Sequence, residues 1–112
     1  MNISDLALKL NAKIITGEHG LSGQINGIYC GDLLSWVMSH AGKDCAWITV
    51  HTHLNIVAVA TLCELACIII PEDIIVEEAT VKRAASEGIP ILSTPLSTYE
   101  ICCIAYECGI GR

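Results

Sequence analysis

The chain has 112 residues, with twelve acidic and six basic side chains that give a formal net charge of −6. Hydrophobic residues make up 53% of it and aromatic residues only 4%, which fits one domain with an aliphatic core and argues against disorder. Surfaces that bind DNA or RNA need clustered lysines and arginines, and Lys82-Arg83 is the only adjacent pair, so no nucleic-acid partner is expected.

Apolar runs and capping residues predict helices and strands that alternate along the chain. In the first half we expect a helix at Leu6 to Asn11 capped by Ser4-Asp5, a strand at Ala12 to Thr16, a turn-rich loop at Gly17 to Gly27, a strand at Ile28 to Gly31, and a helix that Asp32 caps and Gly42 ends. In the second half we expect a strand at Cys45 to Val50, a helix from Asn55 to Ala66, a strand at Cys67 to Ile70, a helix at Glu77 to Glu87, a strand at Pro90 to Leu92, and a helix at Thr98 to Cys108 with Ser97 and Glu100 as a capping box.

This alternation predicts a single α/β domain over residues 1–112 with a mostly parallel sheet, to which the first thirty residues add a small helix-strand cap. In such sheets, ligands bind beside the turns at the carboxyl ends of the strands. The polar residues of these turns are therefore the candidate ligand-binding residues: Asp32, His51, Thr52, His53, Asn55, Ser93, Thr94, Ser97 and Thr98.

The turn His51-Thr52-His53 allows several interpretations. Two histidines in an extended HxH pair can begin a zinc or iron site, but a third ligand is required. Candidates for that ligand come from other turns or helix ends: His40, Asp32, Glu72 and Asp73. The alternatives are contact with a polar ligand, or a structural role in which one histidine bonds the backbone and the other is solvated.

The turn from Ser93 to Thr98 places hydroxyl groups at the start of the last helix, where free N–H groups attract phosphate or carboxylate. The structural alternative is N-capping by Ser97, which does not exclude an anion. Asp32 could meet a ribose hydroxyl or a metal, and the favoured reading is a helix cap.

Motifs of the common catalytic and cofactor sites are missing. The sequence contains no GxxxxGK[ST], GxGxxG, GxSxG or C-x₂-C pattern, so we expect a non-enzyme without a cofactor or bound metal. The seven cysteines are odd in number and mostly lie in apolar runs, as packing thiols do. The N-terminus MNISDLALKL lacks signal-peptide features, and the apolar window Leu54 to Ile70 contains Glu64, so we expect reduced thiols, a cytoplasmic location and no membrane segment.

Several short segments make the chain resemble a stand-alone DRTGG domain over most of residues 1–108. They are Ile28 to Leu33, Ala46 to Val50, Cys67 to Ile70, Gly88 to Thr94, and Ser97 to Glu100. The signature residues themselves are largely replaced, since the Asp-Arg part falls near His53-Leu54 and the Thr-Gly-Gly part near Ile69 to Pro71. No ligand contact is carried over at those positions.

The resemblance implies a Rossmann-like three-layer sandwich that self-associates, here as a homodimer. DRTGG domains are accessory modules beside CBS-pair pyrophosphatases and phosphotransacetylases, and they are similar to the N-terminal domain of HPr kinase/phosphorylase. Short versions with a Thr-His-x-Asn-Ile segment like Thr52 to Ile56 are associated with iron-only hydrogenase gene clusters.

Three functions follow as hypotheses. The first is a regulatory domain that binds a small anionic ligand such as a nucleotide. The second is a metal or iron–sulfur accessory protein linked to the hydrogenase. The third is a structural module that docks onto a larger enzyme of a hydrogenase or kinase system.

Overall fold

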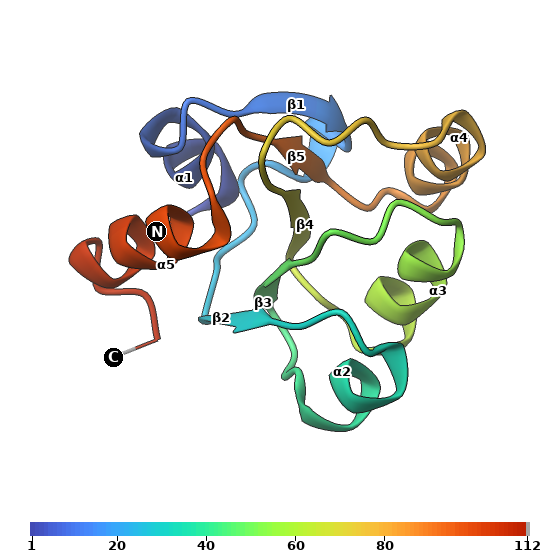
Figure 1. Ribbon diagram of the computed structural model, residues 1–112, viewed down its shortest axis with the longest axis horizontal. Helices are drawn as coiled ribbons and strands as arrows, with labels where there is room; N and C mark the ends of the chain where they lie inside the picture. The colour runs from blue at the N-terminus through green and yellow to red at the C-terminus, as the bar shows by residue number, and fades with distance from the viewer. Residues whose placement is uncertain (112) are drawn as a thin grey trace.

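A computed structural model describes residues 1–111, which fold into a three-layer α/β sandwich (Figure 1). The central sheet has the strand order β1-β5-β4-β3-β2, in which β1 is antiparallel to β5 and every other pair is parallel. The strands are β1 (Lys13–Thr16), β2 (Gly27–Cys30), β3 (Cys45–Ile48), β4 (Cys67–Ile70) and β5 (Ile91–Ser93). The α-helices are α1 (Ile3–Lys9), α2 (Leu34–His40), α3 (Asn55–Leu62), α4 (Glu78–Glu87) and α5 (Thr98–Glu107), and one 3₁₀ turn, η1, spans Glu18–Gly20. The expected fold class is confirmed.

Alternate side chains of the strands supply two cores, one on each face of the sheet. Helices α2, α3 and α4 cover the face that includes Trp47 and Ile68, and α1 and α5 cover the face that includes Ile48 and Ile69 (Figure 1). All four of these side chains are at most 1% exposed. Burial on both faces explains why the central strands are continuous apolar runs rather than alternating ones.

The expected N-terminal helix and strand pack onto the sheet and contribute to its core. Leu6 and Leu10 are fully buried in the cluster that contains Ile48 and Ile69, and β1 joins the sheet as an edge strand. The helix begins earlier than expected, because the Asn2 side chain accepts a 2.8 Å hydrogen bond from the Asp5 amide and takes the capping role assigned to Ser4-Asp5.

Two further caps differ from the prediction. Asp32 does not cap α2, whose N-cap position is Leu33 without a side-chain bond, and Asn55 is the first residue of α3 rather than its cap. Helix α3 also ends at Leu62 instead of Ala66, because Glu64 takes a left-handed conformation with φ 54°. The capping box of Ser97 and Glu100 at α5 is confirmed.

Among residues 1–111, no helix has the length and apolar character that a membrane crossing requires.

Candidate functional site

The carboxyl edge of the sheet, defined here as the turns that follow β2, β3, β4 and β5, is held together by hydrogen bonds between neighbouring turns. Because these four strands are parallel, their turns lie along the same edge. The amides of Glu72 and Asp73 donate to the carbonyls of Leu96 (2.9 Å) and Thr94 (3.0 Å), which joins the turns after β4 and β5.

Asp32 joins the turns after β2 and β3. Its Oδ1 accepts hydrogen bonds from the buried Thr49 hydroxyl at 2.7 Å and from the Val50 amide at 3.0 Å. The ring of His51 contacts the Asp32 carbonyl through Nε2. Since the Val50 amide bonds this side chain instead of a neighbouring strand, β3 ends at Ile48 rather than at Val50. Asp32 therefore links the turns after β2 and β3 instead of capping a helix.

The two histidines of the turn after β3 contact different backbone groups. His51 meets the Asp32 carbonyl, whereas the Nδ1 of His53 accepts from the Asn55 amide at 3.1 Å at the start of α3. Between them, the Thr52 carbonyl accepts from the Thr80 hydroxyl at 2.6 Å, and the Thr52 hydroxyl donates to Glu77 at 3.3 Å. Within residues 1–111, no three His, Cys, Asp or Glu side chains form a group suited to a metal ion.

The hydroxyls of the turn after β5 are also engaged inside the chain. Thr94 is fully buried, and its Oγ1 donates to the Leu10 carbonyl at 2.7 Å and accepts from the Leu96 amide at 3.2 Å. Ser97 accepts from the Glu100 amide, and the Glu100 carboxylate accepts from the Ser97 amide, each at 3.2 Å. This carboxylate brings negative charge to the start of α5, where an anion was expected, and Thr98 beside it is half-buried as the first residue of the helix.

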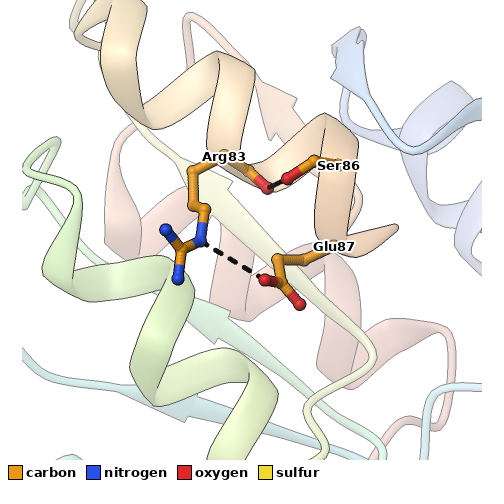
Figure 2. A network of polar contacts seen from close by, with 3 residues as sticks. All are labelled: Arg83, Ser86 and Glu87. Atoms are coloured by element: carbon orange, nitrogen blue, oxygen red, sulfur yellow. Dashed lines mark hydrogen bonds and ion pairs between the residues drawn. The ribbon is translucent and has the colours of Figure 1, made fainter.

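A cavity between α3 and α4 brings one predicted residue together with one that sequence reasoning missed. It has a volume of about 210 Å³ and is lined by Leu54, Asn55, Ala58 and Arg83. A neighbouring cavity of about 290 Å³ also has Ala58 and Arg83 in its wall. Arg83 reaches from α4 across to α3, and its Nε pairs with Glu87 at 3.3 Å (Figure 2).

The sequence carries one signal for Arg83. It lies four residues before Glu87 on an amphipathic helix, which orients its guanidinium along the helix surface. Whether that surface faces solvent or another helix depends on how α3 packs, which the spacing of charges does not specify.

Ser93, the last residue of β5, is the other predicted residue that lines a cavity. Together with Lys13, Ile15 and Ile75 it lines a groove of about 450 Å³ between β1 and α4. The groove is largely apolar, and Ile75 is 87% exposed. Asn55 and Ser93 therefore line separate cavities.

The described residues leave no buried side-chain nitrogen or oxygen without a hydrogen-bond partner. The polar side chains of the carboxyl edge thus hold neighbouring turns together, and the groups with binding capacity to spare are the exposed ones beside it.

Comparison with protein families matches residues 5–108 to the model of the DRTGG domain. The chain belongs to the DRTGG domain family. A search among curated proteins gives no match.

Among solved structures, the DRTGG domain is similar to the CBS and DRTGG domains of the regulatory region of Clostridium perfringens pyrophosphatase, determined in complex with the activator diadenosine tetraphosphate. The TM-score is 0.70 at 11% sequence identity, and the match covers 92% of this chain. It covers 45% of the pyrophosphatase chain, so the protein described here spans less than half of that regulatory region. A match at this identity shows the fold.

Proposed function

We propose that this DRTGG domain is a non-enzymatic regulatory domain that binds a small anionic ligand, such as a nucleotide, between α3 and α4. The observation that carries the proposal is the shared cavity of Arg83 and Asn55. The regulatory role is supported by the family and by the fold that the chain shares with a pyrophosphatase regulatory region.

Arg83 supplies the charge that such a ligand needs. A guanidinium is planar and binds phosphate or carboxylate oxygens through two parallel N–H groups. The ion pair of Arg83 with Glu87 uses Nε, and within residues 1–111 the Nη atoms of Arg83 have no hydrogen-bond partner. The terminal nitrogens are therefore available to an anion.

The surrounding residues suit the remainder of a nucleotide. Asn55 offers an amide that both donates and accepts, and Leu54 and Ala58 offer apolar surface. Typical ligand pockets have volumes of about 300–1,000 Å³, and the two adjoining cavities at Arg83 are each at or below the lower end of that range. A ligand larger than a phosphate would extend along the groove from one cavity into the other.

Thermal-shift and calorimetric titrations against adenine and guanine nucleotides test this function. The proposal predicts saturable binding that falls about tenfold or more in Arg83→Gln, because a charge-assisted hydrogen bond contributes about 1.5–3 kcal/mol. Lys82→Gln is the matched control, since Lys82 is the neighbouring cation on α4 and is paired with Glu78 at 3.2 Å. Failure of every nucleotide to bind, or equal losses in the two variants, would contradict the proposal.

The groove beside β1 supports self-association as a second property, and we propose a homodimer that forms there. An unpaired edge strand with exposed side chains offers backbone groups to another chain. Ile14 and Ile15 of β1 are 39% and 36% exposed, and Ile75 projects beside them.

Sedimentation velocity measures this association directly. Ile75→Lys should shift the protein towards monomer, whereas Leu8→Lys should not, because Leu8 is similarly exposed (80%) but lies on α1 away from the groove. A wild-type protein that stays monomeric at high concentration would refute the dimer.

We further propose that the domain acts in the cytoplasm beside a larger enzyme. The support is its resemblance to hydrogenase-associated DRTGG domains and the place of the similar pyrophosphatase domain within a regulatory region. Co-purification with the hydrogenase from native extract would support this partner, and its absence from such a preparation would count against it.

A further inference from the structure

Two cysteines from distant parts of the chain bring their thiols together at one side of the sheet. Cys30 is the last residue of β2, which is an edge strand, and Cys102 lies on α5, which packs against β2. Their Sγ atoms are 3.3 Å apart, although the residues are separated by 72 positions in the sequence. Both thiols are free; Cys30 is exposed and Cys102 is half-buried.

We propose that Cys30 and Cys102 are an oxidation site at which the two thiols form a reversible disulfide with each other. The oxidant is a small-molecule disulfide such as oxidised glutathione. Bonded sulfurs lie about 2.05 Å apart, so the two Sγ atoms must approach by about 1.3 Å. Neither the family nor the proposed ligand function requires this pair.

The oxidant has a route to both sulfurs. A cavity of about 270 Å³ is lined by Cys30 and Cys102 together with Ile28, Ala105 and Tyr106. Access of this kind distinguishes the pair from a packing thiol such as Cys67, which is fully buried.

The exchange takes place in two steps. Although Cys30 as a residue is exposed, its sulfur packs against Cys102, and desolvation there, followed by the contact with Cys102, raises the pKa of Cys30 to about 12. Cys30 therefore keeps its proton at neutral pH. Cys102 then gives its proton to water and attacks one sulfur of the oxidant. A mixed disulfide on Cys102 forms, the S–S bond of the oxidant breaks, and one thiolate leaves and takes up a proton. Cys30 gives up its proton and displaces the second thiolate, so the two cysteines lose two electrons and the oxidant gains them as two thiols.

The neighbouring cysteine of α5 has a different partner and provides a matched control. Cys103 lies one helical turn after Tyr99 on α5, and a side-chain hydrogen bond with Cys103 raises the pKa of Tyr99. The thiol that meets Cys30 is that of Cys102. Cys103 is half-buried, as Cys102 is. The disulfide would therefore join β2 to α5 specifically and tie an edge strand to the helix that covers it.

The test uses the reduced full chain, exposed to oxidised glutathione, alkylated and analysed by peptide mass spectrometry without reduction. We expect a linked pair of peptides containing Cys30 and Cys102 that dithiothreitol separates. Cys103→Ser should keep this link, Cys102→Ser should lose it, and Cys30→Ser should accumulate glutathione on Cys102.

A wild-type protein that shows no link between Cys30 and Cys102, or that links Cys102 to Cys103 instead, would overturn the proposal. Glutathione on Cys103 rather than on Cys102 in Cys30→Ser would also overturn the assigned order of attack. Circular dichroism of each variant confirms that it is folded, and Cys30→Ala serves as the second variant if Cys30→Ser is not.

Discussion

The Thr94 hydroxyl links the end of α1 to the end of β5, and its removal should destabilise the whole fold. In Thr94→Val the side chain keeps its shape but loses the donor to the Leu10 carbonyl (2.7 Å) and the acceptor for the Leu96 amide (3.2 Å). Thr94 is 0% exposed, so water cannot replace the hydroxyl without rearrangement.

The expected cost follows from those two bonds. A buried group left without its partner costs about 1–3 kcal/mol, which gives about 2–6 kcal/mol for the two groups together. The free energy of unfolding of a domain is about 5–15 kcal/mol, so the variant should lose a large share of its stability. Urea unfolding followed by circular dichroism should show a lower midpoint with an unchanged slope.

Thr61→Val is the matched control, because Thr61 is exposed on α3. It should stay within about 0.5 kcal/mol of the wild type, as surface substitutions usually do. If Thr94→Val also stays within that margin, the hydroxyl is not a buried link and the assignment of Thr94 to the fold rather than to a ligand is wrong.

Three further predictions concern the core, a helix end and a buried thiol. Ile69→Ala removes a fully buried side chain of β4 and should cost about 2–5 kcal/mol in urea unfolding, with a smaller loss arguing against the two-sided core. Glu64→Gly should stabilise the protein by about 0.5–1 kcal/mol, because glycine adopts the left-handed conformation (φ 54°) without strain, whereas Ala85→Gly inside α4 should cost about as much; destabilisation by Glu64→Gly would contradict this. Burial raises the pKa of the Cys67 thiol from 9.0 to about 12, so the unfolded chain loses this proton at a lower pH than the folded protein does. The free energy of unfolding should therefore fall as the pH rises from about 9, by up to about 1.4 kcal/mol per pH unit. The fall should be less steep in Cys67→Ala, and equal slopes would refute the burial of this thiol.

The parts of the fold that the sequence predicted correctly are those that local pattern determines. The run Cys67–Ile70 is uniformly apolar, which indicates a strand covered on both faces, and it became the central strand β4. The capping box of Ser97 and Glu100 is defined by two residues of one turn, and both of its bonds are present.

The errors arose where a distant contact outweighed a local preference. Aspartate is a common helix cap, but the carboxylate of Asp32 accepts from the Thr49 hydroxyl in the turn after β3 instead. Such a contact depends on the pairing of β2 with β3, which propensities do not encode.

The candidate site was predicted only in part for the same reason. Asn55 could be named from its place in a turn, whereas the role of Arg83 depends on α4 packing beside α3. Thr94 and Ser97 were named for their hydroxyls, and the structure shows those hydroxyls bonded within the chain. The positions of the helices thus decide which polar residues of a turn bond within the chain and which can bind a ligand.

A nuclear magnetic resonance titration of the ¹⁵N-labelled chain with a nucleotide tests the central claim most directly, because it reports on each amide separately. The account predicts saturable shifts that cluster at Leu54, Asn55, Ala58 and Arg83. Saturable shifts confined to the turn from Thr94 to Ser97, or no saturable shift with any nucleotide, would contradict it.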